Sequence, residues 1–214
     1  MNEHSAVMQS DSVGRKERER DQRRREILEA ALGLFSQKGY EGTSMAEIAA
    51  ASEFAVGTLY KFFKDKNDLY QALVADTMRQ YEVPLVEALR SAGSPADRID
   101  RFVETAAGLF VRHLPMSRVY FSQTAAAFLF PSAGLEDEAF HSYARIIDAL
   151  RATFEEGLQN GEFAGADAPV LARSLEGVLG GFLSALVRDP ASYSPEQIAA
   201  LTRRVFFGPT LVGR

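Results

Sequence analysis

Residues 43–66, TSMAEIAAASEFAVGTLYKFFKDK, end in a cluster of basic side chains at Lys61, Lys64 and Lys66. Lysine ammonium groups neutralise phosphates, and such contacts carry most of the affinity of many proteins for DNA. Three lysines in six residues are also common on a solvated helix face. The sequence that precedes the lysines decides between these two interpretations.

Two short helical patterns precede the lysines. Ser44 and Glu47 have the spacing of a capping box, which predicts that a helix begins just after Ser44. A break at residues 51–54 separates it from a second pattern, AVGTLYKFF, in which Leu59 and Phe63 share one apolar face. The segment is therefore predicted to be a helix-turn-helix whose second helix packs through Leu59 and Phe63.

The outer face of this second helix carries small side chains at Ala55, Val56, Gly57 and Thr58. A helix with little bulk at its N-terminal end fits into a major groove close to the base edges. Lys61 then lies where it can contact a phosphate. The pattern favours DNA binding over a merely solvated helix.

The run Gly-Thr-Leu-Tyr-Lys-Phe-Phe-Lys-Asp-Lys-Asn-Asp-Leu, preceded by Gly39-Tyr40 and Thr43-Ser44, resembles the DNA-binding domain of the TetR (tetracycline repressor) family over roughly residues 22–75. The resemblance implies an all-α chain, with an N-terminal three-helix helix-turn-helix domain and a C-terminal helical bundle for ligand binding and dimerisation. It also implies a cytoplasmic homodimeric repressor that a small, largely apolar ligand releases from a palindromic double-stranded DNA operator. The DNA contacts that it implies are Ser44, Tyr60, Lys61 and Lys66 to phosphates, and Ala55, Val56, Gly57 and Thr58 to bases.

Two positions depart from the family pattern. Glu53 stands in the turn where the family usually has glycine, and Ala55 stands at the helix cap where it usually has serine. A cap hydroxyl is worth on the order of 1 kcal/mol, and a residue other than glycine is strained where the turn needs a positive φ. We expect both to weaken the turn without abolishing the fold.

Composition excludes several classes of protein. The net charge is −5, yet all five lysines lie in the first third of the chain, which indicates a local DNA-binding face on an acidic body. There is no cysteine, and only three histidines, so neither a disulfide nor a metal site is expected. No cofactor is implied, and no nucleophile–base pair or phosphate loop suggests an enzyme. No apolar run approaches the roughly 18 residues of a membrane span, so we expect a soluble protein without a membrane partner.

Three segments follow from these patterns. Residues 1–21 are expected to be a disordered, charged tail, residues 22–68 the helix-turn-helix domain, and residues 69–214 the ligand-binding and dimerisation domain. The charged run at residues 15–25 is interpreted as a solvated extension of the next helix, or as an arm against DNA; its interleaved acids favour the first. Pro84 predicts a kink or an end in the fourth helix.

The C-terminal domain contains several amphipathic patterns and one segment, residues 116–132, that is apolar on nearly every side. Such a segment predicts a buried central helix, in which polar side chains need partners from the protein or from a ligand. His113 is more simply a core histidine than a ligand contact. The ligand-contact candidates are Phe110, His113, Met116, Tyr120, Gln123, Thr124, Phe128, Tyr143 and Phe154, although core packing explains most of these aromatic residues equally well.

The segment 167–188 has too wide an apolar stripe for one buried face, and three glycines interrupt it. Large apolar faces rarely stay exposed, so a two-fold interface with a second subunit is expected, as the resemblance also implies. The predicted interface residues are Leu175, Val178, Phe182, Leu186, Leu201 and Val205. Two other functions remain open: a regulator that uses no small molecule, and a helical ligand-binding or scaffold protein whose DNA-binding head is idle.

Overall fold

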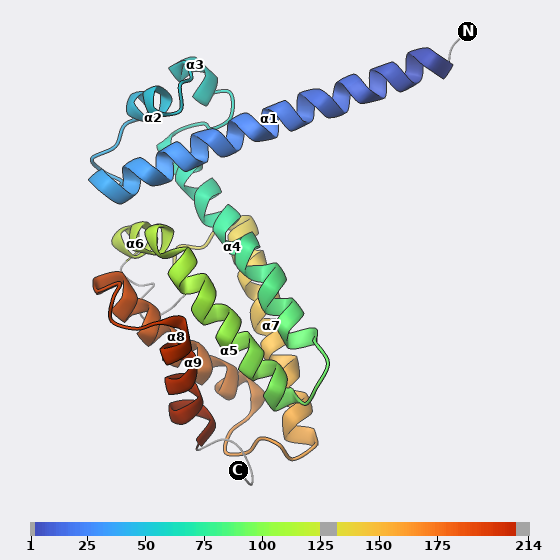
Figure 1. Ribbon diagram of the computed structural model, residues 1–214, viewed down its shortest axis with the longest axis vertical. Coiled ribbons are helices and arrows are strands. Elements are labelled where there is room, and N and C mark those ends of the chain that lie inside the picture. Colours follow the sequence, from blue (N-terminus) through green and yellow to red (C-terminus); the bar gives the residue numbers. More distant parts are fainter. Residues whose placement is uncertain (1–2, 125–131, 209–214) are drawn as a thin grey trace. The chain divides into compact units, whose positions relative to one another are not determined.

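The computed structural model describes residues 3–124 and 132–208, with side chains from residue 15 onward. The described residues form helices joined by turns and contain no strand, so the all-α prediction is confirmed. It divides into an N-terminal unit, Met1–Leu73, and a C-terminal unit, Val74–Arg214. Figure 1 shows the order of the helices within each unit.

Helix α1, Glu3–Lys38, begins far earlier than the sequence predicts. Residues 3–21, expected to be a disordered tail, are helical. Glutamate, glutamine and arginine are good helix formers, and pairs such as Arg15–Glu19, 3.3 Å apart, connect successive turns. The helix ends where predicted, because Gly39 adopts a φ of 76° that favours glycine.

Helices α2, Met45–Ala51, and α3, Val56–Leu59, form the helix-turn-helix and lie on one side of α1. α3 is much shorter than the predicted pattern, although hydrogen-bonded turns continue to Phe63, whose N–H donates to the Leu59 carbonyl at 2.9 Å. Buried side chains hold the N-terminal unit together, among them Ile27, Phe35, Ile48, Leu59 and Leu69.

Helix α4, Lys66–Arg90, supplies residues to both units. It continues through Pro84, so the helix does not end there. In the C-terminal unit, α4 is joined to α7 by an ion pair between Glu82 and Arg145 and by another between Arg79 and Glu138, 2.7 Å apart. These pairs connect the part of α4 that begins at Val74 to α7, and they contribute little stability because their side chains are largely exposed.

The C-terminal unit also contains α5, Pro95–Arg112; α6, Leu114–Gln123; α7, Asp137–Gln159; α8, Ala168–Arg188; and α9, Pro195–Thr202, with the π-helical turn η2, Arg203–Phe207. These helices match the predicted patterns. The predicted central helix at 116–132 corresponds to α6 as far as Gln123, and residues 125–131 lie outside the described part of the chain.

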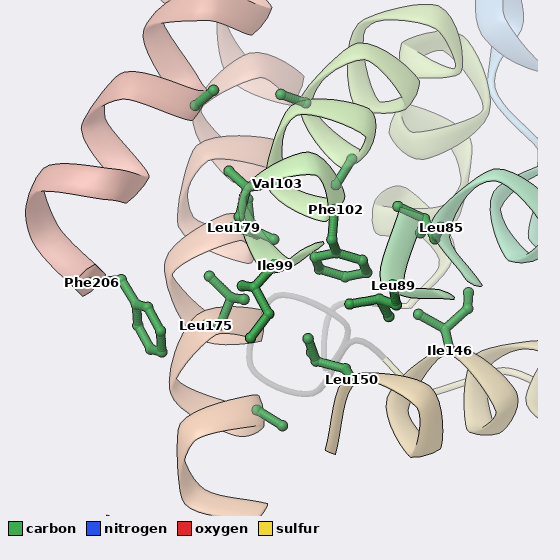
Figure 2. Close-up of a cluster of buried hydrophobic side chains, with 14 of the residues drawn as sticks. Leu85, Leu89, Ile99, Phe102, Val103, Ile146, Leu150, Leu175, Leu179 and Phe206 are labelled. Atoms are coloured by element: carbon green, nitrogen blue, oxygen red, sulfur yellow. The ribbon is translucent and has the colours of Figure 1, made fainter. Parts of the chain in front are cut away.

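The core of the C-terminal unit lies where α4, α5, α7 and α8 meet. Figure 2 shows Ile99 and Phe102 of α5 among leucines of the neighbouring helices. Ile99 and Leu175 are fully buried. Burial of an aliphatic or aromatic side chain contributes about 1.5–3 kcal/mol, so this cluster supplies the stability that permits a cavity elsewhere in the same unit.

Candidate nucleic-acid interface and ligand cavity

The start of α2 is fixed by the predicted capping box. The Glu47 N–H donates to the Ser44 hydroxyl at 3.2 Å, and the Ser44 N–H donates to the Glu47 carboxylate at 2.9 Å. Lys38 also donates to Glu47 at 2.7 Å. Hydrogen bonds from Lys38 and from Ser44 lower the pKa of Glu47 to about 2. The Ser44 hydroxyl donates to Glu47 too, so a phosphate at Ser44 has to compete with this carboxylate.

The turn between α2 and α3 has the strain that the two sequence departures predict. Glu53 adopts a φ of 59°, in the left-handed region that favours glycine. Ala55 occupies the N-cap of α3 and provides no side-chain hydrogen bond. Only the Ala55 carbonyl contributes, accepting from the Thr58 N–H at 2.7 Å. Backbone hydrogen bonds hold the turn despite this strain: the Glu53 N–H donates to the Ala50 carbonyl at 3.2 Å, and the Phe54 N–H donates to the Ala49 carbonyl at 3.0 Å.

The predicted base-reading residues lie at the N-terminal end of α3. Ala55, Val56 and Gly57 are exposed, and Thr58 is half-buried, whereas Leu59 is fully buried and anchors the helix. A Cβ added to Gly57 meets no atom within 4 Å. Nothing inside the described protein therefore requires a glycine at this position.

The basic residues after α3 differ in their surroundings. Lys61 and Lys64 are exposed, and Tyr60 is 54% exposed. Lys66, in contrast, donates to the carbonyls of Tyr40 and Thr43 at 2.9 and 3.0 Å. Its ammonium group lies 4.2 Å from the centre of the Tyr40 ring. Two of the three donors of Lys66 are thus used inside the protein.

The N-terminus of α4, which begins at Lys66, an implied phosphate contact, carries acidic side chains. Asp65 caps the helix by accepting from the Asp68 N–H at 2.8 Å. Asp68 in turn accepts from the Lys64 N–H at 2.7 Å. Two carboxylates satisfy these backbone donors and oppose an anion, so the end of α4 is a weaker phosphate site than the sequence predicts.

The C-terminal unit contains a cavity of about 180 Å³, partly open to solvent, between α4, α5, α6, α7 and α8. Most of its wall is apolar. Four of the predicted ligand contacts line the cavity: Phe110, Met116, Tyr120 and Tyr143. Their contact with a ligand stays a prediction.

The other predicted contacts lie elsewhere. Phe154 is fully buried in the core, with its ring 5.2 Å from that of Phe163. Gln123 is exposed, and Thr124 is half-buried outside the cavity wall. Phe128 lies outside the described residues. Uniform apolarity conceals which face of a helix points inward, so the sequence could not separate wall residues from core residues.

His113 caps α5 and packs edge-on against Tyr81, with ring centres 5.3 Å apart. Burial lowers the pKa of His113, and the neighbouring Arg112 lowers it further. The cavity wall does not include His113. His113 therefore packs as a structural histidine, although its buried Nε2 atom has no hydrogen-bond partner in the described part of the chain.

A polar cluster on the cavity wall was missed from the sequence. The Tyr143 hydroxyl donates to Glu176, which also pairs with Arg173 at 2.8 Å. Only 10% of the Glu176 side chain is exposed. Burial and the hydrogen bond to Glu176 raise the pKa of Tyr143 to about 12. The sequence feature that could have revealed this cluster is Glu176, an acidic residue inside the apolar pattern of α8.

The predicted dimer residues separate into two groups. Leu175 and Leu186 are fully buried in the subunit core, which corrects their assignment to an interface. The wide stripe of α8 contains both an inward and an outward face, and the sequence does not distinguish them. Val178, Phe182 and Leu201 are half-buried, and Val205 is 56% exposed.

The outward face of α8 is unusually apolar. α8 is long and apolar enough to cross a membrane by length and composition, although we expected no such segment. Its most apolar window has a mean hydropathy of 1.5, and 28% of that window is buried in the chain. The core helix of a soluble protein passes the same test, so this is weak support for a membrane span. Among the described residues no acidic, histidine or cysteine cluster suits a metal ion.

Comparison with known proteins agrees with this architecture. The family model for "Bacterial regulatory proteins, tetR family" matches residues 27–73, and that for "BetI-type transcriptional repressor, C-terminal" matches residues 95–206, more than half of the chain. The HTH-type transcriptional repressor KstR of Mycolicibacterium smegmatis is 27% identical over 157 residues, covering 73% of this chain and 72% of that protein.

Solved structures share the fold. A transcriptional regulator from Pseudomonas aeruginosa PAO1 superposes with a TM-score of 0.71 at 22% identity, covering 88% of this chain and 90% of that one. AibR in complex with isovaleryl coenzyme A and operator DNA superposes with a TM-score of 0.66 at 28% identity, covering 86% of this chain and 98% of that one. The present chain belongs to the TetR family of bacterial transcriptional regulators.

Proposed function

We propose that this chain is a homodimeric repressor that reads a palindromic operator with the N-terminal end of α3. A small apolar ligand releases it by binding in the cavity. The observation that carries the DNA-binding role is Gly57. A glycine within a helix costs about 1 kcal/mol relative to alanine, and no neighbour in the described protein requires it. The close approach of a base edge explains this cost.

The proposed DNA contacts are the residues predicted from the sequence, but the structure changes the contribution expected from each. Ala55, Val56, Gly57 and Thr58 face bases. Tyr60 and Lys61 face phosphates, and their exposure supports this role. Ser44 contributes if the phosphate displaces the Glu47 carboxylate from its hydroxyl. Lys66 has one free donor for a phosphate, and its main role is to fasten the loop after α1 to the start of α4.

The proposed ligand has a short apolar group. A cavity of about 180 Å³ is close to engineered apolar cavities of about 150 Å³ that bind benzene, and well below the roughly 300–1,000 Å³ of sites for drug-sized ligands. A branched acyl chain such as that of isovaleryl coenzyme A, which AibR binds, has the right size. The Tyr143–Glu176 pair offers the only charged group on the described wall.

The proposed dimer interface is the outward face of α8 with the adjacent face of α9, which packs beside it. Val178, Phe182, Leu201 and Val205 remain in it. Val170, 51% exposed, lies two turns before Val178 and extends the same face. Burying these apolar side chains against a second copy removes a surface that soluble proteins rarely leave exposed.

Variants on the two faces of α8 test this interface. Val178→Glu is expected to yield a folded monomer in analytical ultracentrifugation, because it places a charge at the centre of the outward face. Leu186→Glu is expected to unfold the protein instead, because Leu186 is fully buried. A Val178→Glu protein that retains the dimer mass would place the interface elsewhere.

Release of DNA is proposed to act through α4. This helix supplies Val74, Met78 and Leu85 to the cavity wall, and it begins at Lys66 in the N-terminal unit. A ligand that binds better to one position of α4 shifts the population toward it. In that position of α4, the distance between the two α3 helices of the dimer no longer matches the spacing of the operator half-sites. DNA affinity then falls, typically about 5–150-fold. The role is regulatory rather than enzymatic, in the cytoplasm.

Selection of the purified protein on random duplex DNA tests the operator. We expect enrichment of an inverted repeat, since each subunit of a two-fold dimer reads one half-site. A salt titration then compares this sequence with scrambled DNA. Weak binding that is equal for all sequences would contradict a repressor and favour a ligand-binding or scaffold protein with an idle head.

A thermal-shift screen tests the ligand class. Isovaleryl coenzyme A, free coenzyme A and a steroid form a graded panel. Isovaleryl coenzyme A is expected to raise Tm and to lower operator affinity, while coenzyme A without the acyl chain does neither. A response to the steroid and not to the acyl chain would mean that the cavity expands to admit a larger ligand.

A further inference from the structure

The wall of the cavity in the C-terminal unit is apolar except for several hydroxyl groups and one carboxylate. The wall residues that the structure describes include no lysine, arginine, histidine, asparagine or glutamine. The polar side chains among them are Thr77, Tyr81, Ser117, Tyr120, Tyr143 and Glu176. The described wall therefore offers a ligand no side-chain N–H donor.

The phenol groups of the wall use their hydrogens inside the protein. Tyr81 and Tyr120 donate to backbone carbonyls, Tyr81 at 3.3 Å, and Tyr143 donates to Glu176. Burial raises the pKa of Tyr81, and a hydrogen bond from Ser117 lowers it. Burial and the bond to Glu176 raise the pKa of Tyr143 to about 12, so this phenol stays protonated at neutral pH. A phenol has one hydrogen to donate, so these groups offer a ligand only their lone pairs.

The Glu176 carboxylate can accept more hydrogen bonds than the protein supplies. One of its oxygens accepts from Tyr143, and the other accepts from Arg173 at 2.8 Å. A carboxylate has about four acceptor sites, and only 10% of this side chain is exposed to solvent. Because buried polar groups are normally hydrogen-bonded, a donor on a ligand would complete the partners of Glu176.

Arg173 determines which kind of donor fits. Its side chain is 59% exposed, and Arg173 is not among the described wall residues, so it approaches Glu176 from the solvent side. Because the pair is close to neutral as a whole, a cationic ligand would gain little from Glu176 and would be repelled by Arg173. An anionic ligand would face the carboxylate. A charged group that loses its hydration needs a compensating partner, so a neutral hydroxyl fits best.

We propose that the cavity selects a neutral ligand whose short apolar chain carries a hydroxyl group, and that this hydroxyl donates to Glu176. The inference rests on the proposed ligand-binding function of the cavity and specifies the class of ligand. A plain acyl chain of isovaleryl size suits the volume of about 180 Å³, but it has no hydrogen to donate. A hydroxylated chain of the same size fills the cavity and completes the hydrogen bonds of Glu176.

A matched series of probes on one branched skeleton tests this selectivity. Isoamyl alcohol carries a neutral donor, and isoamyl fluoride replaces the hydroxyl by an atom of similar size that cannot donate. Isoamylamine is a cation and isovalerate an anion at neutral pH. The Kd of each probe is measured by NMR titration of the full-length chain. The alcohol is expected to bind at least about tenfold more tightly than each of the other probes, the effect of one hydrogen bond to a charged group.

Two variants identify the acceptor. Tyr143→Phe leaves Glu176 with one more open acceptor site, so the preference for the alcohol over the fluoride should be at least as large as in the wild type. The double variant Tyr143→Phe, Glu176→Met removes both polar groups, and the ratio of the two Kd values should fall to about one. Circular dichroism and thermal melting check the fold of both variants, and Tyr143→Phe, Glu176→Gln is a second variant that keeps the shape of Glu176 and should reduce the ratio at least about threefold.

The outcomes separate this inference from the proposed function. An alcohol that binds no better than the fluoride, or does not bind, overturns the inference, and so does tighter binding of the amine or of isovalerate. A preference that persists in the double variant also overturns it, because the acceptor is then another group. Tight and selective binding of the alcohol without any change in operator Kd would leave the ligand class standing and overturn the proposed control of DNA binding by the cavity.

Discussion

The two candidate sites of this protein are constructed in opposite ways. The end of α3 presents small exposed side chains and is anchored by the buried Leu59. The cavity is a volume of about 180 Å³ that five helices leave unfilled. The surface at the end of α3 is formed by consecutive residues. The cavity forms only after helices that are distant in sequence have packed together. A site of consecutive residues evolves by changing its own side chains, whereas the cavity depends on everything around it.

Gly57→Leu is expected to have the largest effect, because it should weaken operator binding without lowering the stability of the protein. A Cβ at this position meets no atom within 4 Å, and Ala55 and Val56 beside it are exposed, so the protein should be as stable as the wild type or slightly more stable, because leucine is a better helix former than glycine. Specific operator binding should fall at least about 100-fold, since loss of one or two base contacts costs about 1–3 kcal/mol each. Fluorescence anisotropy and thermal melting measure the two effects.

Gly33→Leu is the matched control for Gly57→Leu. Gly33 also has open space for a Cβ, but it lies within α1, away from the end of α3. This variant should keep its operator affinity. Equal losses of affinity in both variants would show that leucine perturbs the unit as a whole rather than the reading surface.

Filling the cavity should remove the response to the ligand. Gly180 lines the cavity, and a Cβ there meets no atom within 4 Å. Gly180→Phe is expected to abolish the Tm shift caused by the best compound of the panel, and to reduce the ratio of operator Kd with and without that compound to about one. Gly180→Ala leaves most of the volume free and should respond like the wild type. A filled cavity that still responds would move the ligand site elsewhere.

Lys66 and Lys64 are expected to differ in their effect on the stability of the N-terminal unit. Lys66→Met removes hydrogen bonds from a charged donor to two carbonyls, and such bonds contribute about 1.5–3 kcal/mol. Tm should fall by several degrees. Lys64→Gln should leave Tm unchanged, because Lys64 is exposed. An unchanged Tm in Lys66→Met would return Lys66 to a purely phosphate-binding role.

The smallest effects concern the turn before α3. Glu53→Gly relieves a left-handed φ at a cost of about 0.5–1 kcal/mol in the unfolded chain, against about 1–2 kcal/mol of strain. Ala55→Ser adds a cap worth on the order of 1 kcal/mol. Both should raise the free energy of unfolding in urea by up to about 1 kcal/mol. A loss in either variant would mean that the strained turn is compensated by an interaction of Glu53 or Ala55.

The contrast also explains what the sequence could predict. Leu59 and Phe63 are buried as their spacing requires, and the Ser44–Glu47 capping box forms as expected, because these features are local. The sequence resemblance even located the strain at Glu53. The expected disorder of residues 1–21 was wrong from Glu3 onward, because α1 begins there, whereas the preferred interpretation of residues 15–25 as a solvated extension of the helix is confirmed.

Residues in the C-terminal unit were harder to assign for a physical reason. Leu186 and Val178 belong to the same apolar pattern, yet one is fully buried and the other half-buried. Phe154 is in the core and Phe110 lines the cavity. These differences arise from contacts between helices far apart in sequence, and hydrophobic periodicity carries no information about which apolar face meets which neighbour.

The central claim is that the cavity controls the affinity of the end of α3 for DNA. The most direct test is the operator Kd of the wild-type chain, measured at fixed salt in a titration with isovaleryl coenzyme A, with coenzyme A as the reference. The account predicts that Kd rises about 5–150-fold with the acyl compound and stays constant with coenzyme A. Acyl-compound binding, seen as a Tm shift that Gly180→Phe removes, combined with an unchanged operator Kd would contradict it.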